Sequence, residues 1–423
     1  MGIRYNSRMQ SFIYESEESH VCKAWTRSEI LEQVGLLFDK AKNRLPKRKS
    51  AKIVIKPNLN NDLNALTGNS VDLRVLDALV RVLKKKGYTN ITIADGPNVG
   101  IERRGIDVFS RLGIRKLCAL HEIHLVDLNA DLGVRLSLSG AAQPKIAQTI
   151  RTADFLISVP KIKTHCEAQL SCAMKNWVGI CVGQDKRHMH LDLGLNIAIL
   201  SEHIQPDLIL VDGIVGMEGN GPGDGQPRAI QHLLLSSSLI INDLIVSQLV
   251  GLSPTEIPYL VHAIQRQNVP DKLIKAIQRQ FSPILNILRP PPRSRLAILS
   301  ETKILNGLKL AVRPLTARPE VLDIAYRFGV VQDVYDPVDA TVTHIHRDAT
   351  NCGDCNRCEI YCPVGIPLEE IGSDHSDCLS CLQCWWVCPN DALIWEGERG
   401  HLQRHKEKYS SPILDMLTHV EEK

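Results

Sequence analysis

Eight cysteines in the last fifth of the chain form one motif that occurs twice. The spacing CxxCxxCxxxCP is found at Cys352, Cys355, Cys358 and Cys362, and again at Cys378, Cys381, Cys384 and Cys388. Three cysteines at these intervals can wrap around one iron–sulfur cube, while the fourth, before proline, reaches the other cube. The spacing predicts two [4Fe–4S] clusters, with the ligand sets Cys352, Cys355, Cys358 and Cys388, and Cys378, Cys381, Cys384 and Cys362.

Other uses of the cysteines fit this spacing less well. Zinc sites usually take two CxxC pairs, and a disulfide scaffold is not expected inside a chain of 423 residues without an export signal. The other five cysteines are expected to be buried free thiols. For three of them a third cluster is the alternative. Those three are Cys166, Cys172 and Cys181.

Composition indicates an ordinary globular protein, with 44% hydrophobic and 23% charged residues. No stretch reaches the roughly 18 apolar residues that a membrane span needs, and the first twenty residues lack the apolar core of a secretory signal. The sequence therefore predicts a soluble, cytoplasmic protein without a membrane span.

Charge is unevenly distributed along the chain. Residues 351–396 hold eight acidic residues and one basic residue, a net charge of −7, which leaves +10 for the rest of a chain whose formal charge is +3. This asymmetry indicates an acidic module beside a basic body. The basic residues are scattered and aromatic residues make up only 4%, so no nucleic-acid partner is expected.

Short apolar runs alternate with helical patterns from residue 52 onward. The runs KIVIK, NITIA, ADFLISV and DLILV begin at Lys52, Asn90, Ala153 and Asp207. The alternation predicts an α/β fold whose mostly parallel sheet has helices on both faces, followed by a small α+β ferredoxin-like domain. The predicted divisions are a helical extension at 1–50, the α/β body at 51–340, the cluster domain at 345–400 and a tail at 401–423, which is either a terminal helix or disordered.

Charged and polar residues follow the carboxyl ends of four predicted strands. Because these ends line one crevice in an open parallel sheet, they predict a site. If the segment after Pro160 is extended, Lys161, Lys163 and His165 project to one side. A cationic crevice fits an anionic ligand or a lysine that donates a proton. The candidate catalytic residues are Lys161, Lys163, His165, Lys175, Asp95 and Asp212, and the candidate binding residues are Lys56, Asn58 and Asn176.

The sequence leaves the roles of two further motifs open. The glycine-rich stretch at 213–225 lacks the GK[ST] of a Walker loop, so a lid, a backbone cradle for an anion and a plain surface loop all remain possible. His188, His190 and Asp192 could bind a metal or belong to an ordinary loop. The sequence has no flavin or nicotinamide fingerprint.

The cysteine domain resembles the two-cluster bacterial ferredoxins over about 50 residues. The body resembles the family called domain of unknown function 362, over about residues 50–250. The matching pieces are KPN at Lys56, ADGP from Ala94, PKIKTH from Pro160, MKNWVG from Met174, VDG from Val211 and GNGPGDG from Gly219. Members of that family often carry a C-terminal ferredoxin. The resemblance implies an α/β body with a pocket near these motifs and implies no particular reaction.

These observations lead to one hypothesis and two alternatives. The hypothesis is a ferredoxin-fused reductase that passes electrons from two [4Fe–4S] clusters to a small anionic organic substrate in the crevice. An external electron donor would be a ferredoxin, a flavodoxin or a reductase. The first alternative is an electron-transfer or docking protein that serves a partner redox enzyme. The second is a non-redox enzyme with structural clusters.

Overall fold

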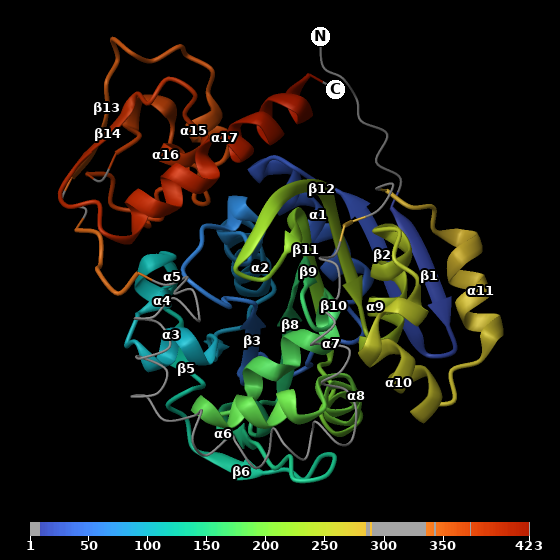
Figure 1. Ribbon diagram of the computed structural model, residues 1–423. Helices are drawn as coiled ribbons and strands as arrows, with labels where there is room; N and C mark the ends of the chain where they lie inside the picture. Colours follow the sequence, from blue (N-terminus) through green and yellow to red (C-terminus); the bar gives the residue numbers. More distant parts are fainter. Residues whose placement is uncertain (1–8, 285–287, 290–335, 342–343, 373, 423) are drawn as a thin grey trace.

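A ten-stranded sheet forms the centre of the molecule (Figure 1). The structure, a computed structural model, describes residues 9–284, 288–289, 336–341, 344–372 and 374–422. Eight strands follow one another in the order β1-β2-β12-β11-β8-β3-β4-β5, and β9 joins β11 and β10. Their bounds are β1 (Gln10–Tyr14), β2 (Glu17–Lys23), β3 (Ile53–Pro57), β4 (Ile91–Asp95), β5 (His124–Asp127), β8 (Phe155–Val159), β9 (Lys161–His165), β10 (Gln169–Ser171), β11 (Leu208–Asn220) and β12 (Asp224–Ser236).

The centre of the sheet is parallel, as the alternation of strands and helices predicts. Strands β11, β8, β3, β4 and β5 pair in parallel, whereas β1, β2 and β12 add an antiparallel edge. The structure of residues 10–23 differs from the helical extension that the sequence predicts for residues 1–50. The predicted segment contains a helix, but its residues 10–23 form a hairpin that pairs with β12 and extends the sheet.

Helices cover both faces of the sheet and enclose two hydrophobic cores. In β3, Ile53 and Ile55 belong to one core and Val54 to the other, the two-residue alternation of a strand buried on both faces. One face packs against α1 (Arg27–Lys40), α2 (Leu73–Lys85), α3 (Val99–Arg103), α4 (Val108–Arg111) and α5 (Ile114–Leu120). The other packs against α6 (Gln148–Arg151), α7 (Ala173–Asn176), α8 (Leu193–His203), α9 (Leu239–Leu249), α10 (Pro258–Arg266) and α11 (Asp271–Gln280).

The glycine-rich stretch at 213–225 is a β-hairpin and not a loop. Strands β11 and β12 pair from Ile209–Ser236 out to Asn220–Asp224. Glycine is needed here because a Cβ on Gly216 would lie 2.9 Å from the carbonyl oxygen of Ile162. The tip is fixed to the body, since Thr164 Oγ1 donates a 2.8 Å hydrogen bond to the carbonyl oxygen of Gly219.

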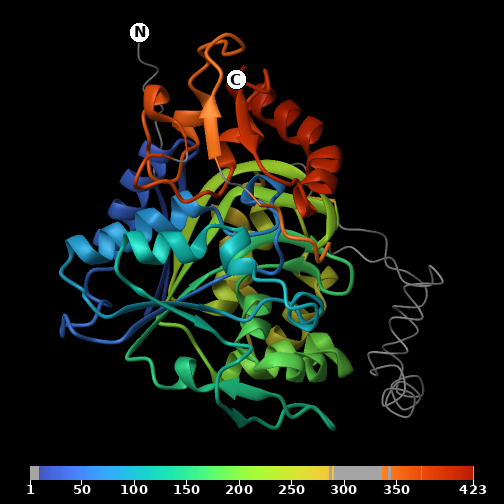
Figure 2. The same ribbon diagram turned by 90° about the vertical axis from the view of Figure 1, so that its left-hand side faces the viewer.

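The cysteine-rich segment forms a small unit on top of the body (Figure 2). It consists of β13 (His344–Arg347), α15 (Arg357–Ile360), α16 (Gln383–Val387), β14 (Leu393–Glu396) and α17 (His401–Glu421). The sequence left open whether the tail at 401–423 is a terminal helix or disordered, and the structure shows the helix α17. The buried side chains of this unit, including Tyr361 and Trp386, belong to the same hydrophobic core as α1 and α2.

Two further expectations from the sequence concern the extent of the body and the absence of a membrane span. The predicted body at 51–340 includes residues 290–335, which lie outside the described residues. In the described part of the chain, none of the helices has both the length and the apolar character that crossing a membrane requires.

Candidate functional site

A cavity of about 550 Å³ opens at the carboxyl ends of the parallel strands. It lies where an open α/β sheet binds ligands, and its volume is in the range typical of small-molecule sites. Seven of the predicted site residues line it: Lys56, Asn58, Asp95, Lys163, His165, Lys175 and Asn176.

Lys56 and Asp95 form a buried ion pair in this cavity. Lys56 Nζ lies 2.7 Å from Asp95 Oδ1, and both side chains are 2% exposed. Lys56 Nζ also donates to Asn176 Oδ1 at 2.6 Å. Burial lowers the pKa of Lys56, and the charge of Asp95 opposes this shift. The pair is locally neutral and holds Asn176 in place.

Lys163 and Lys175 have no carboxylate within ion-pair distance among the residues that the structure describes. Lys163 Nζ donates to two neutral acceptors, Asn58 Oδ1 at 2.9 Å and the carbonyl oxygen of Asn69 at 2.8 Å. Burial lowers the pKa of Lys163 well below its usual value, and the charge of Lys175 lowers it further. Burial also lowers the pKa of Lys175 to about 8. The charge of Asp95 opposes the shift at Lys163 and the charge of Glu167 opposes that at Lys175, but burial is the larger effect in both cases.

His165 is neutral and presents a defined tautomer. Its Nδ1 accepts the backbone N–H groups of Glu167 at 3.1 Å and Ala168 at 3.3 Å. Burial lowers the pKa of His165 well below its usual value, and the charge of Lys175 adds to this effect. Because Nδ1 accepts, the neutral ring carries its proton on Nε2, where it can donate to a ligand.

The turn that carries Lys175 and Asn176 depends on a residue that the sequence did not reveal. Asp243, in α9, accepts the N–H groups of Ala173 at 2.9 Å and Met174 at 3.1 Å. It is fully buried. Only the three-dimensional packing of α9 against α7 brings Asp243 to this turn, so no local signal could have indicated it.

Additional cations of the cavity come from the segment after MKNWVG. Lys186 and Arg187, in the 3₁₀ helix Gly183–Leu191, line the cavity together with His190 and Arg103. Burial lowers the pKa of Lys186 to about 8. The sequence drew attention to His188, His190 and Asp192 as possible metal ligands, yet no three His, Cys, Asp or Glu side chains among the described residues are arranged to hold a single metal ion.

Lys161 and Asp212 do not line the cavity, although the sequence predicts both as site residues. Lys161 Nζ donates to Asp212 Oδ2 at 2.8 Å, and neither side chain is exposed. Asp212 Oδ2 also accepts the N–H of Asp72 at 2.7 Å. The two-residue period of β9 is correct, but the chain segment around Asp72 covers Lys161 and leaves Lys163 open to the cavity.

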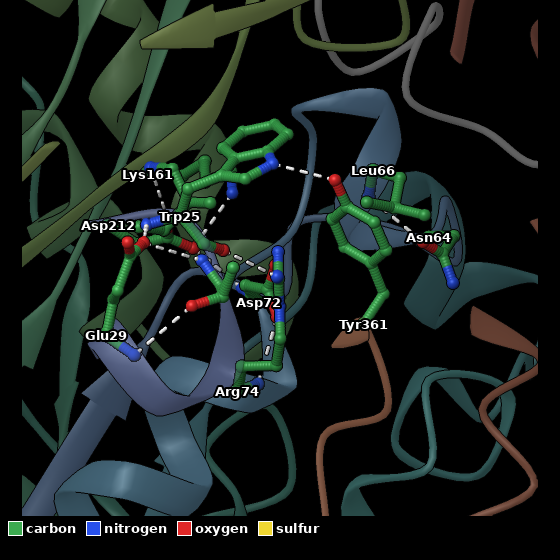
Figure 3. Close-up of polar contacts among 11 residues, drawn as sticks. Trp25, Glu29, Asn64, Leu66, Asp72, Arg74, Lys161, Asp212 and Tyr361 are labelled. Carbon is green, nitrogen blue, oxygen red and sulfur yellow. Dashed lines mark hydrogen bonds and ion pairs between the residues drawn. The ribbon is translucent and has the colours of Figure 1, made fainter. Parts of the chain in front are cut away.

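A buried polar network leads from this ion pair to the cysteine-rich unit (Figure 3). Asp72 caps α2 and pairs with Arg74 at 2.7 Å, where both side chains are fully buried. Arg74 Nη1 donates to the carbonyl oxygen of Trp25 at 2.7 Å, and Trp25 Nε1 donates to the Tyr361 hydroxyl at 2.7 Å. Arg74 also lies over the Tyr361 ring, 4.9 Å from its centre.

The eight motif cysteines line two separate small cavities. One is lined by Cys352, Cys355, Cys358 and Cys388, and the other by Cys362, Cys378, Cys381 and Cys384. These are the two sets that the spacing groups together, an arrangement compatible with metal clusters. Backbone N–H groups also point at the last sulfur of each motif, from Ile366 to Cys362 at 3.4 Å and from Ala392 to Cys388 at 3.2 Å.

The two cysteine loops repeat the same unusual backbone. Asp354 and Asn356 flank the second cysteine of the first motif with φ of 49° and 56°, and Ser380 and Leu382 do so in the second with φ of 50° and 58°. A left-handed leucine is costly, by roughly 1–2 kcal/mol. The matching φ values show that the two cysteine loops share one backbone conformation, as the repeated sequence motif predicts.

The second cysteine set, unlike the first, contacts the body beside the cavity. Asn64 Nδ2 donates to the carbonyl oxygen of Cys381 at 3.3 Å, and Lys116 Nζ donates to Ser380 Oγ at 2.7 Å. Asn60, four residues before Asn64, lines the cavity. Because four residues of chain extend over at most roughly 14 Å, the contact at Asn64 lies near a residue that lines the cavity. The first set is nearer to solvent, since Cys355 is exposed.

A methyl group on Gly179 is expected to disturb the cavity. Its Cβ would lie 2.5 Å from Lys56 Nζ and 2.9 Å from Asp95 Oδ1, so Gly179→Ala should lower the free energy of unfolding by about 1–3 kcal/mol. Gly35, within α1, has no heavy atom within 4 Å of the added Cβ. Gly35→Ala should therefore raise the free energy of unfolding by about 0.5–1 kcal/mol. Urea denaturation measures both, and equal shifts would contradict the close contact at Gly179.

Three comparisons relate parts of this chain to known proteins. A thylakoid-associated protein of Synechocystis sp. is 30% identical over 121 residues, which are 27% of this chain. The matched region covers 38% of the length of that relative. The lactate racemase apoprotein of Thermoanaerobacterium thermosaccharolyticum aligns with a TM-score of 0.31 and 12% identity, over 50% of this chain and 56% of that one. The family model described as domain of unknown function (DUF362) matches residues 53–248, a range that includes every residue lining the cavity.

Proposed function

We propose that this chain is an iron–sulfur oxidoreductase that passes electrons from two [4Fe–4S] clusters to an anionic organic substrate in the cavity. The observation that carries the proposal is the pair of four-cysteine cavities, one of which contacts the chain segment that lines the substrate cavity. The domains proposed with it are the body at 51–340, preceded by residues 1–50, the cluster unit at 345–400 and the tail at 401–423.

The donor sets fit iron–sulfur clusters better than single metal ions. Four thiols around each cavity match the ligand number of a cubane, and backbone N–H groups directed at sulfur are a usual feature of such sites. A single ion would need three or more ligands that converge on one point, which the described residues do not provide. When bound, the clusters supply electrons one at a time at low potential.

The residues of the cavity would bind the substrate and supply protons. Lys163, Lys175 and the Nε2–H of His165 offer donors to an anionic group, and an approaching anion favours their charged forms. Lys175, whose pKa is lowered to about 8, can give up a proton near neutral pH. The Lys56–Asp95 pair would fix the orientation of Asn176 and its amide donors.

Metal analysis of anaerobically purified protein tests the first half of the proposal. The expected content is about eight irons and eight acid-labile sulfides per chain, with electron paramagnetic resonance signals of reduced clusters after treatment with dithionite. Protein that contains zinc and lacks acid-labile sulfide would overturn the proposal.

A lysine variant tests the second half, which separates an enzyme from an electron carrier. Lys163→Met removes a charged donor from the cavity, and losses of this kind weaken transition-state binding by about 10- to 100-fold. Reoxidation of the reduced clusters by the substrate should slow by that factor while the iron content is unchanged. Lys85→Met, at an exposed position of α2, is the matched control. A docking protein would keep reduction of its partner in both variants.

A further inference from the structure

Four lysines belong to the described lining of the cavity, and one of them differs from the rest in how its amine is held. Three of the amines are bonded to fixed side-chain acceptors, in the pairs Lys56–Asp95, Lys163–Asn58 and Lys186–Asn129. The fourth amine, that of Lys175, has neither a hydrogen bond nor an ion pair with any residue that the structure describes. Its nitrogen is therefore open to a ligand.

Several charged groups act on Lys175 and partly cancel one another. Burial lowers the pKa of Lys175 to about 8. The charges of Glu167 and Cys166 oppose this shift, and the charge of Lys56 adds to it. Glu167 Oε2 in turn lies 2.8 Å from His190 Nδ1, and both of these side chains are partly exposed. With all of these groups present, roughly a tenth of the Lys175 amine is neutral at pH 7, against about one part in a thousand or less for an ordinary lysine.

Two hydrogen-bond donors of the cavity lie beside Lys175. After burial, the charge of Lys175 is the largest cause that lowers the pKa values of Lys163 and His165, so its amine is near both. The Nε2–H of His165 faces a ligand because Nδ1 accepts two backbone N–H groups. A carboxylate that accepts hydrogen bonds from these two side chains would place its neighbouring carbon atom close to the amine.

The backbone that carries Lys175 is held by buried hydrogen bonds, although the amine itself is not. Asp243 accepts the N–H groups of Ala173 at 2.9 Å and Met174 at 3.1 Å. On the other side of Lys175, Asn176 is buried and its side chain is fully bonded within the body. A fixed point of attachment and an unused lone pair are what a nucleophilic amine requires.

Lys163 meets these requirements less well than Lys175. Its side chain is only 2% exposed. Its Nζ is anchored by two acceptors, Asn58 Oδ1 at 2.9 Å and the carbonyl oxygen of Asn69 at 2.8 Å. An amine held in this way can donate to a bound carboxylate, but it would have to break both hydrogen bonds to attack a carbon atom.

We infer that Lys175 is a nucleophile that forms an imine with the substrate, and that the cavity takes short 2-oxo acids, whose carboxylate is bound by Lys163 and His165. A 2-oxo acid carries its carbonyl group directly beside the carboxylate, which matches the position of the amine beside the two donors. The inference rests on the proposed function only in taking this cavity as the substrate site.

Imine formation needs no oxidant or reductant. The neutral Nζ of Lys175 adds to the carbonyl carbon, the C=O π bond breaks, and the oxygen takes up a proton. The nitrogen then releases a proton to water. The hydroxyl group takes up a further proton and leaves as water while the C=N double bond forms. One amine and one carbonyl group thus give one imine and one water molecule.

Trapping with sodium cyanoborohydride, which reduces an imine to a stable secondary amine, tests the inference. The full chain is purified anaerobically, its iron content is measured, and it is incubated at pH 7 with pyruvate and the reductant. Peptide mass spectrometry then gives the rate at which each lysine is modified. Lys175 should be modified at least about tenfold faster than Lys85, because a larger fraction of its amine is neutral. Lys85 is an exposed lysine of α2.

Acetone separates recognition of the carboxylate from reactivity of the amine, since it has a carbonyl group but no carboxylate. Lys163→Met should slow the modification of Lys175 by pyruvate about 10- to 100-fold and change its modification by acetone less than about threefold. Lys85→Met is the matched control and should leave both rates at Lys175 unchanged.

Three results would overturn the inference. These are modification of Lys175 no faster than that of Lys85, modification of Lys163 in place of Lys175, or an equal effect of Lys163→Met on pyruvate and acetone. The wild-type rates decide the question even where Lys163→Met fails to fold.

The same preparation distinguishes failure of this inference from failure of the proposed function. Fast modification of Lys175 in protein that contains zinc and lacks acid-labile sulfide would refute the redox function and leave this inference standing. Full iron content without fast modification of Lys175 would refute the inference and leave the redox function standing.

Discussion

Cys381→Ala is expected to remove one of the two proposed clusters and to abolish the proposed delivery of electrons to the cavity. Cys381 lines the cysteine cavity that contacts the body through Asn64, and a cubane needs four cysteine ligands. Iron should fall from about eight to about four atoms per chain. Reoxidation of the reduced protein by the substrate should fall by at least about 100-fold, because electrons would no longer have a relay beside the cavity.

The matched control for this variant is Cys166→Ala. Cys166 is exposed and lines neither of the cysteine cavities, so its loss should leave the iron content unchanged. Iron content and the rate of reoxidation are measured on both variants in the same preparation. Unchanged iron in Cys381→Ala would contradict the predicted ligand sets, and iron lost in Cys166→Ala would revive the third cluster.

Asp212→Ala is expected to lower the free energy of unfolding by about 3–5 kcal/mol. The variant leaves the ammonium of Lys161 buried without its partner, and it removes the acceptor of the Asp72 N–H. Both side chains of the ion pair are fully buried, so water cannot replace the lost carboxylate. The midpoint of urea denaturation measures the change.

Two further variants serve as controls for this prediction. Glu202→Ala removes one side of a partly exposed ion pair with Arg266, and such pairs contribute little to stability. The double variant Lys161→Met/Asp212→Leu removes both charges, and replacing a buried pair by apolar residues often costs little. It should recover much of the stability lost in Asp212→Ala. A single variant as stable as Glu202→Ala would show that Lys161 and Asp212 are not a buried pair.

The parallel centre of the sheet and seven of the residues that line the cavity were predictable from local patterns. Strands such as β3 and β8 are short apolar runs, and the charged residues that follow them must share one end of a parallel sheet. Lys163 and His165 face the cavity because β9 is extended, as the two-residue period requires. These inferences use only residues that are neighbours in the sequence.

The features that the sequence did not reveal depend on partners that are far apart along the chain. The hairpin at residues 10–23 becomes part of the sheet only by pairing with β12, more than 200 residues later. The glycines at 213–225 indicate a loop, but close approach of other backbone segments explains them equally well. Lys161 has the same local pattern as Lys163, and only the segment around Asp72 separates their roles.

Prediction of Lys186 and Arg187 as cavity residues required the position of one helical segment. Lys186 and Arg187 stand in a polar stretch that is typical of a solvated loop. They become site residues because the 3₁₀ helix Gly183–Leu191 packs against α3. The basic pair Lys186-Arg187, shortly after the MKNWVG motif at 174–179, is the one signal that could have indicated them.

The cysteine-rich unit shares its apolar core with α1 and α2, and this affects whether the chain can be divided into fragments that fold separately. A chain truncated at residue 343 would leave the Trp25 indole N–H without the Tyr361 hydroxyl. It would also expose the apolar side chains against which Trp386 and its neighbours pack. Neither fragment would keep a closed interior, so loading of the proposed metal centres and completion of the body should occur as one cooperative event.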